Sequence, residues 1–471
     1  MLPEKFKERM MNLLGDEAQD LFSEIENGKA VRSFRINPIK VKNEEDLLLN
    51  AQLDHKKADF PPECYYTEEQ FPGSLACHHS GAIYMQDPSA MATVHAITGK
   101  KGIKILDSCS APGGKTTQLA AIAGDDGVVV ANEYDTKRCR ILQGNVERLG
   151  CRNTVVTNLD TSVLAEVYPC FFDVVLCDAP CSGEGMFRKN ELAISEWSEE
   201  KVLSCAKMQR EILSNVAKCV AEGGFLIYST CTFSLEENEQ NVDWFLREHA
   251  DFELCEVGDD LKNATADGIV DENYCVDMSL TRRIYPHKFK GEGQFIALFA
   301  RKNVSGAPVL RENAKKKRDS KQARVAHEET ESLHQARLFL EENLVETPDK
   351  KLLYLNGKVY LSPEIVLPKY SVFASGVCVG ELERGRFVPR HQLFSAYGDL
   401  FARKLVLSSD DERVTAYLKG LEIAAHDLEI AERAKNSGFA AVTVDGTALG
   451  GGKVSNGICK NHYPKGLRNQ K

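Results

Sequence analysis

The stretch Asp107-Ser-Cys-Ser-Ala-Pro-Gly-Gly-Lys-Thr-Thr117 decides the fold expected for this chain. An apolar run at 103–106 precedes it, and a segment with helical composition follows at 118–123. The order strand, glycine turn, helix exposes backbone N–H groups at a helix N-terminus, where α/β proteins bind nucleotide-like ligands. The pattern therefore predicts an α/β fold whose functional site lies at this turn.

Three kinds of ligand-binding glycine loop are candidates for this stretch. A phosphate-binding P-loop would end in Gly114-Lys115-Thr116, but it would also need glycine where this chain has Cys109. The dinucleotide fingerprint G-x-G-x-x-G is absent from the stretch. The third candidate is the looser loop of S-adenosylmethionine methyltransferases, whose ligand carries a carboxylate and a sulfonium but no phosphate. Taken alone, Gly-Gly-Lys does not separate these loops from an ordinary turn before a helix.

Acidic residues recur where the expected strands end. Glu133, Asp160 and Asp178 each stand at or just after the end of an apolar run, as Asp107 does. Ligands of open α/β sheets lie beyond the carboxyl ends of the strands, so we expect these carboxylates at one edge of the sheet. Glu133 stands about 20 residues past the glycines, where an acidic side chain meets ribose hydroxyls. A single such acid is usually a helix cap, but four of them favour a ligand site.

Two cysteines also follow expected strands. Cys181 lies three residues past Asp178, and Cys231 follows the apolar run at 224–230. A thiolate near a helix N-terminus is activated, whereas most cysteines of a reduced protein are small buried apolar residues. For either cysteine alone, the role of a small buried apolar residue is the commoner one. Together they suit methylation of carbon 5 of cytosine, because thiolate addition at carbon 6 activates carbon 5 and a base must later remove its proton.

Several motifs, in their order along the chain, resemble the Nop/Sun family of RNA 5-methylcytosine methyltransferases. They are Cys-Ser-Ala-Pro-Gly-Gly-Lys at 109–115, Asp-Ala-Pro-Cys-Ser-Gly at 178–183, Thr-Cys-Thr at 230–232, Tyr-Pro-His-Lys at 285–288 and Gly-Glu-Gly-Gln-Phe at 291–295. The combination is far more specific than any single motif. The resemblance implies that Cys231 is the nucleophile, that Cys181 assists release of the methylated product and that Asp178 stabilises the protonated cytosine ring.

The same resemblance implies a pocket for S-adenosylmethionine at the glycine loop and the strand ends. The residues expected to line it are Cys109, Ser110, Ala111, Pro112, Gly113, Gly114, Lys115, Glu133, Asp160 and Asp178. No metal is expected. Cys177, Cys181 and the pair His78-His79 come nearest to a zinc ligand set, but they lack the regular spacing of zinc sites.

Length and composition describe a globular protein of several domains. The chain has 471 residues, of which 43% are hydrophobic and 27% charged. No stretch approaches the roughly 20 apolar residues of a membrane span, and the first residues are too charged for a signal peptide. Because the 15 cysteines are irregularly spaced in a long chain, we expect reduced thiols and a cytoplasmic protein.

The net charge of −10 is unfavourable for an RNA-binding protein, but the charge is unevenly distributed. Residues 301–471 contain 28 basic and 21 acidic residues, whereas residues 1–300 contain 31 basic and 48 acidic residues. The asymmetry suggests that the later part contacts phosphate while the earlier part carries the chemistry. A solvated basic tail would produce the same asymmetry.

Periodicity and composition divide the chain into five expected parts. They are an N-terminal extension (1–85), to which the resemblance assigns RNA binding, the sheet domain (86–302), a basic polar linker (303–331), a first C-terminal domain (332–389) and a final small α/β unit (390–471). In the extension, Arg32 and Arg35 of an expected strand could meet RNA phosphate, but a solvent-facing position is the simpler expectation. An amphipathic helix is expected at 332–344.

The C-terminal part resembles the bacterial small-subunit ribosomal RNA methyltransferase F group. The resemblance rests on Gly376-Val-Cys-Val-Gly-Glu, on Gly385-Arg-Phe-Val-Pro and on residues 457–468, and it implies a PUA-like RNA-binding end. We therefore expect a Rossmann-like class I methyltransferase sheet with an N-terminal α+β extension and C-terminal RNA-binding α+β domains.

The resemblance also implies a partner, which is ribosomal RNA or the small ribosomal subunit. A monomer without an obligate protein partner or a membrane is expected. Transfer RNA is the alternative substrate. Two alternatives belong to other classes of protein: a P-loop nucleotide hydrolase would bind ATP through Lys115, and a non-catalytic ribosome assembly factor would not need Cys231.

Overall fold

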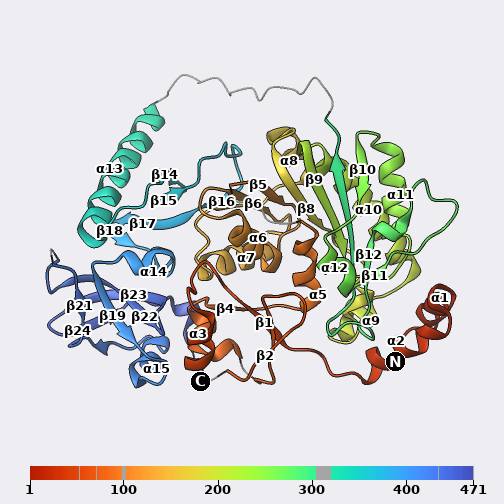
Figure 1. Cartoon of the computed structure of the whole chain (residues 1–471). Coiled ribbons are helices and arrows are strands. Elements are labelled where there is room, and N and C mark those ends of the chain that lie inside the picture. Colours follow the sequence, from red (N-terminus) through yellow and green to blue (C-terminus); the bar gives the residue numbers. More distant parts are fainter. Residues whose placement is uncertain (52, 71, 98–101, 304–319, 433, 470–471) are drawn as a thin grey trace.

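The computed structural model describes the chain except residues 52, 71, 98–101, 304–319, 433 and 470–471. At its centre lies a mixed β-sheet with helices on both faces (Figure 1). Five parallel strands form the middle of this sheet: β5 (Lys104–Asp107), β6 (Val128–Asn132), β7 (Thr154–Thr157), β8 (Phe172–Asp178) and β9 (Val220–Thr230). They follow the expected strands closely, and the predicted α/β class is confirmed.

The strand order of the described sheet is β11-β12-β13-β9-β8-β5-β6-β7-β16, where β16 is Val372–Ser375, and β10 pairs with β13. The chain runs from β5 outward to β7 and then returns to β8 on the other side of β5. The direction of winding therefore reverses between β5 and β8, which is where ligands bind in sheets of this kind. The strands beyond β9 are β10 (Phe252–Cys255), β11 (Ala266–Asp267), β12 (Arg282–Ile284) and β13 (Gln294–Arg301).

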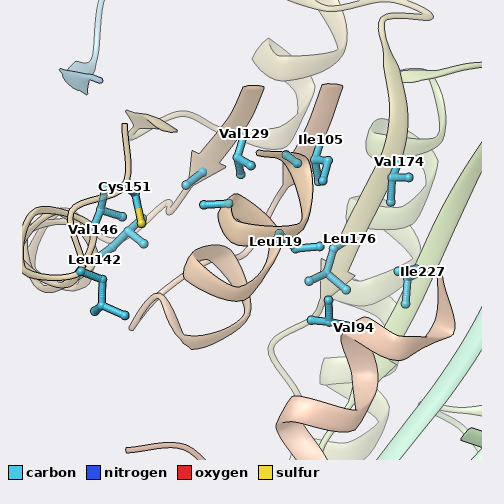
Figure 2. Packing of buried hydrophobic residues seen from close by; sticks show 14 of the residues in the cluster. Val94, Ile105, Leu119, Val129, Leu142, Val146, Cys151, Val174, Leu176 and Ile227 are labelled. Carbon is cyan, nitrogen blue, oxygen red and sulfur yellow. The ribbon is translucent and has the colours of Figure 1, made fainter. Parts of the chain in front are cut away.

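Helices cover this sheet because its strands are apolar on both faces, as in other parallel sheets. All five residues of β6 are buried. Figure 2 shows Ile105, Leu176 and Ile227, from three neighbouring strands, packed with Leu119 and Val94 in one buried cluster. The helices of this domain are α5 (Pro88–Ala92), α6 (Gly114–Ala123), α7 (Thr136–Arg148), α8 (Thr161–Val167), α9 (Glu191–Ser195), α10 (Glu199–Ala217), α11 (Glu239–Glu248) and α12 (Asp259–Ala264).

The N-terminal extension is divided between two places. Its first helices, α1 (Glu4–Leu14) and α2 (Ala18–Asn27), pack beside α9, where Phe6 contacts Phe187 and Trp197 edge to face. The rest forms a small sheet of order β2-β3-β1-β4 beside the central domain (Figure 1). Its elements are β1 (Ser33–Ile36), α3 (Glu44–Asn50), β2 (Lys56–Lys57), β3 (Cys64–Tyr66), α4 (Ala76–His79) and β4 (Ile83–Met85).

The first C-terminal part is not separate from the central sheet. Its β16 pairs antiparallel with β7, so the sheet ends on a strand from far along the chain. The helix expected at 332–344 begins earlier, at Ser320. The linker, which was expected to reach residue 331, therefore ends before this helix. Linker residues 304–319 lie outside the described part. The elements are α13 (Ser320–Asn343), β14 (Lys351–Leu355), β15 (Lys358–Ser362), β16 (Val372–Ser375), β17 (Val377–Glu383) and β18 (Arg386–Pro389).

In its described residues, the last unit is a six-stranded sheet with two α-helices, and the strand order is β20-β24-β23-β22-β19-β21. One apolar cluster, which includes Leu340, Val359 and Phe394, joins it to the preceding part. The elements are α14 (His391–Tyr397), β19 (Arg403–Leu407), α15 (Glu412–Leu418), β20 (Ile423–Ala424), β21 (Glu429–Ile430), β22 (Gly438–Val444), β23 (Thr447–Ser455) and β24 (Ile458–Asn461). Within the described residues, no helix has both the length and the apolar character needed to cross a membrane.

Candidate active site

The glycine turn joins β5 to α6 at the point where the winding reverses. Gly113 has a φ of 109°, a conformation that glycine adopts far more readily than other residues, and α6 begins at the next residue. A Cβ on Gly114 would lie 3.2 Å from side-chain atoms of both Tyr84 and Gln86. Glycine suits this turn because its backbone is left-handed and because the N-terminal extension packs directly on it.

A cavity of about 230 Å³ opens at the turn. The segment between β4 and α5 forms one wall of it, together with Tyr84 and Met85 of β4. Of the residues expected to bind the cofactor, those that line it are Cys109, Ser110, Ala111, Pro112, Gly114, Lys115 and Asp178. The structure therefore gathers most of the predicted set around one space.

Asp107 contributes a buried carboxylate to this cavity, with 1% of the residue exposed. Its Oδ2 accepts from Thr116 Oγ1 at 2.6 Å, whereas Oδ1 is buried without a partner among the described residues. Burial raises the pKa of Asp107 to about 7. Because an unpartnered buried acceptor is costly, this oxygen suits a cationic group of a ligand.

Lys115 reaches from the first turn of α6 to the end of β8. Its Nζ donates to Asp178 Oδ2 at 2.7 Å. Burial opposes the charge on Lys115, but the attraction of Asp178, with a contribution from Cys231, outweighs it and raises the pKa of Lys115. Asp178 Oδ1 accepts from Ser229 Oγ at 2.6 Å and from Gln294 Nε2 at 3.3 Å. Both oxygens of Asp178 are thus held between the glycine turn and the strands beside it.

Cys181 and Cys231 meet beyond the ends of β8 and β9. Their sulfur atoms lie 3.2 Å apart, well beyond the roughly 2.05 Å of a disulfide, and both thiols are free. The hydrogen bond with Cys231 and burial raise the pKa of Cys181 well above its ordinary value. Either sulfur can donate the hydrogen bond that joins them, and the raised pKa favours the protonated form of Cys181.

The two other expected carboxylates lie at the end of β6 and before α8. Glu133 is buried, and its Oε2 accepts from the backbone N of Ala111 at 3.3 Å and lies 3.5 Å from Arg138. Asp160 is exposed, and its Oδ1 accepts from the backbone N and the hydroxyl of Ser162 at 2.9 and 2.6 Å. Glu133 is joined to the glycine turn, whereas Asp160 makes the contacts of a helix cap.

Our sequence reasoning missed how the N-terminal extension supports the glycine turn. Arg35 is buried under α6, where it donates to Gln86 Oε1, Gly114 O and Thr117 Oγ1 at 2.9, 3.1 and 2.5 Å. The expectation that Arg35 faces solvent is therefore wrong, and burial lowers the pKa of Arg35 to about 10. A signal was present, because residues three apart on a strand, such as Arg32 and Arg35, point to opposite faces.

The parallel middle of this mixed sheet, with a glycine turn after β5 and a cavity at the reversal of winding, has the Rossmann-like fold of class I methyltransferases. The family described as 16S rRNA methyltransferase RsmB/F matches residues 94–300. The N-terminal domain of 16S rRNA methyltransferase RsmF matches residues 2–88, and the methyltransferase RsmF PUA domain matches residues 404–469. The chain belongs to the family of the ribosomal RNA small subunit methyltransferase F, and the family expected from its motifs is confirmed.

Relatives of this family cover nearly the whole chain. The ribosomal RNA small subunit methyltransferase F of Vibrio campbellii is 30% identical over 99% of this chain and 97% of its own length. That of Aeromonas salmonicida is 30% identical over 93% of this chain and 90% of its own length. Among solved structures, a methyltransferase homologue from Pyrococcus horikoshii has 28% identity and a TM-score of 0.56, covering 64% of this chain and 95% of that one. NSun6 from the same organism, at 21% identity and a TM-score of 0.54, shares the fold over 64% of this chain and 99% of its own.

Proposed function

We propose that this protein methylates carbon 5 of a cytosine in small-subunit ribosomal RNA through a covalent bond between a cysteine and the base. The observation that supports this best is the 3.2 Å contact between Cys181 and Cys231, beside the pair formed by Lys115 and Asp178. Two thiols and a carboxylate are the groups that the reaction needs. The names of the relatives support ribosomal RNA as the substrate.

The residues at the glycine turn fit S-adenosylmethionine as the cofactor. Asp107 Oδ1 is an unpartnered acceptor suited to its ammonium group, and the N-terminus of α6 is suited to its carboxylate. We assign Glu133 to the ribose hydroxyls and place Asp160 at the outer edge of the same pocket. When bound, S-adenosylmethionine supplies the electrophilic methyl group that carbon 5 receives.

The reaction that we propose begins with Cys231. Its thiolate forms a bond to carbon 6 of the cytosine, and the electron pair of the 5,6 double bond shifts toward carbon 5. Lys115 favours the thiolate by its charge, and Asp178 stabilises the proton on the ring nitrogen. After methylation, the carbon 5 proton passes to solvent water, its C–H electron pair restores the 5,6 double bond, and the bond between carbon 6 and sulfur breaks to release Cys231 as a thiolate. Cys181 assists this elimination.

We further propose how the parts of the chain share the work. The sheet domain (86–302) carries out the chemistry, while the extension (1–85) and the two C-terminal parts (332–389 and 390–471), attached through a linker that ends before α13 (Ser320–Asn343), bind the surrounding RNA. The PUA match and the excess of basic residues after residue 300 support this division. The protein would act as a cytoplasmic monomer without an obligate protein partner. Transfer RNA is the alternative substrate, and a non-catalytic role in ribosome assembly is the alternative function.

A direct test compares substrates. The protein would be incubated with methyl-labelled S-adenosylmethionine and, separately, with small-subunit ribosomal RNA, assembled small subunits and transfer RNA. Nucleosides would then be analysed by mass spectrometry. We expect labelled 5-methylcytidine from the ribosomal RNA or from the subunit. Label in transfer RNA alone would move the substrate to the alternative, and label in a nucleoside other than 5-methylcytidine would refute the chemistry.

Substitution of Asp178 tests its role as the group that stabilises the ring. Asp178→Asn keeps the shape of the side chain but removes the negative charge, so we expect kcat to fall on the order of 10²- to 10³-fold. The measurement is steady-state methyl transfer with RNA in excess. Gln294→Ala is the matched comparison, because it removes only the 3.3 Å bond to Asp178 Oδ1 and should cost much less. Full activity of Asp178→Asn would contradict the assignment.

The pKa of Asp107 predicts how pH affects cofactor binding. Because the pKa is raised to about 7, the carboxyl group is mostly protonated below this pH and mostly ionised above it. Only the ionised form attracts an ammonium group, so the affinity for S-adenosylmethionine should rise up to about tenfold between about pH 6 and 7.5. Titration calorimetry would measure this. Asp107→Asn should bind more weakly at every pH, and the rise should disappear; a rise that persists would assign it to another group.

A further inference from the structure

Two loops carry the cysteines of the site, and hydrogen bonds join these two loops close to the sulfur atoms. The first cysteine loop (179–185) follows β8 and contains Cys181. The second cysteine loop (231–238) follows β9 and begins with Cys231. The backbone N of Gly185 donates to the carbonyl of Cys231 at 2.9 Å. The spacing of the two sulfurs therefore depends on contacts between the loops as well as on the strands.

Glu237, which belongs to the second cysteine loop, binds the backbone of the first. Its Oε2 accepts from the backbone N of Ser182 at 3.0 Å and from Gln209 Nε2 at 2.8 Å. Gln209 Nε2 also donates to the carbonyl of Pro180 at 2.9 Å. Glu237 and Gln209 thus hold the two neighbours of Cys181 in the chain. The other oxygen of Glu237 accepts from Ser234 Oγ at 3.0 Å, within its own loop.

Glu184 makes the reverse connection, from the first cysteine loop to the second. Its Oε2 accepts from the backbone N of Phe233 and from Thr232 Oγ1, both at 2.9 Å. Its Oε1 accepts from Trp197 Nε1 at 2.9 Å. The hydroxyls of Thr232 and Ser182 lie 2.8 Å apart and complete the link. The residues that follow the second cysteine are therefore held by a carboxylate from the opposite loop.

Carboxylates have a specific advantage in this position. Both Glu184 and Glu237 have 0% of their surface exposed, and burial raises the pKa of each. A buried acid is costly unless hydrogen bonds compensate for the lost water. Each acid here accepts from three donors, and an amide could not replace it fully because one of its two ends is itself a donor. Neither residue lines the cavity at the glycine turn.

We propose that Glu184 and Glu237 are reciprocal positioning residues, in which each carboxylate fixes the cysteine loop opposite to its own and together they set the distance between Cys181 and Cys231. This inference rests on the covalent reaction proposed above. Glu237 serves the elimination step, because it holds the loop of Cys181. Glu184 serves the addition step, because it holds the loop of Cys231.

The division of roles can be tested in the full-length protein. Glu237→Gln should lower kcat about 100-fold, since misplacing a reacting group by about 1 Å has an effect of this size. The fraction of RNA covalently attached to the denatured protein should rise above that of the unchanged protein, because elimination is slowed. Glu184→Gln should slow the formation of the adduct in a Cys181→Ala background by a similar factor. The affinity of both variants for S-adenosylmethionine should stay within about twofold, since neither residue contacts the cavity.

Control variants remove the third bond of each carboxylate and keep the bonds between the loops. Ser234→Ala does this for Glu237, and Trp197→Phe does it for Glu184. Both should keep kcat within about threefold. If a glutamine variant does not fold, aspartate is tested at the same position, because it keeps the charge but is too short to reach the opposite loop. The aspartate variants should show the same effects, on elimination for Glu237 and on addition for Glu184.

Two outcomes would overturn the proposal, and they differ in what they leave standing. If Cys181→Ala traps RNA while both glutamine variants lose activity only in proportion to their thermal stability, the two glutamates are structural and the covalent reaction stands. If Cys181→Ala traps no RNA although it binds S-adenosylmethionine and RNA, the covalent reaction fails and the positioning roles fail with it.

Discussion

Cys231→Ala is expected to lower methyl transfer to RNA on the order of 10⁴-fold or more, which is the size of effect seen when an enzyme loses its nucleophile. Without addition at carbon 6, carbon 5 of cytosine is too weak a nucleophile to take a methyl group. Cys181 lies 3.2 Å from Cys231; without Cys231 the hydrogen bond that raises the pKa of Cys181 is lost, but burial still raises this pKa and disfavours the Cys181 thiolate. It is therefore not expected to substitute for Cys231. Label transfer to RNA under single-turnover conditions measures the loss.

The Cys231→Ala variant should still bind the cofactor, because Cys231 does not line the described cavity at the glycine turn. Cys275→Ala is the matched control, since Cys275 is an exposed free thiol and its loss should leave the rate unchanged. A Cys231→Ala protein that retains more than a tenth of the activity would show that the base is attacked by another group or that no covalent bond is needed. It would then support a direct transfer mechanism.

The central sheet could be predicted from the sequence because local patterns determine it. The apolar run expected to end at Asp178 forms β8, which does end there, since an apolar run bounded by polar turns has one compact solution when helices cover both faces. The same reasoning located the ends of β5 and β6 within a residue. Each of these strands was visible without knowledge of its neighbours, and their carboxyl ends defined the edge that carries the site.

Elements that depend on distant parts of the chain were not visible in this way. Nothing in residues 372–375 indicates that β16 closes the edge of the sheet beside β7, more than 200 positions earlier. Arg35 was expected in solvent because its strand alternates with polar residues, yet the glycine turn supplies acceptors that make burial favourable. Such pairings are decided by tertiary packing, and local composition carries little information about them.

The candidate site, like the fold, could be predicted from the sequence only in part. The motifs identified both cysteines, Asp178 and the glycine turn as separate pieces, and the fold brings them together. The unpartnered oxygen of Asp107 and the bond from Gln294 to Asp178 could not be foreseen, because they depend on side-chain geometry between elements up to 116 positions apart. Asp160 shows the reverse problem. The sequence identifies it as an acid at the end of a strand, but in the structure it makes the contacts of a helix cap.

Cys181→Ala is expected to trap the enzyme on its RNA. Cys231 would still add to the base and the methyl group would still be transferred, but elimination would lose the residue that assists it. The covalent fraction recovered after denaturation should rise at least about tenfold, because a general acid or base typically contributes 10²- to 10⁴-fold to its step. Turnover should fall by a similar factor, while a single methyl group per enzyme is still transferred. Gel electrophoresis under denaturing conditions would show the adduct, and sequencing the attached RNA would identify the target.

The Cys181→Ala/Cys231→Ala double variant separates this reaction from unspecific crosslinking. It should carry no attached RNA, because the sulfur that forms the bond is gone, and it should still bind S-adenosylmethionine. Both cysteines must be replaced in this comparison, because the two sulfurs lie 3.2 Å apart and either could reach the same base. If the single Cys181→Ala variant turns over normally and only Cys231→Ala accumulates adduct, the two roles are exchanged. If the adduct persists in the double variant, a different residue forms the bond, and neither cysteine is the nucleophile.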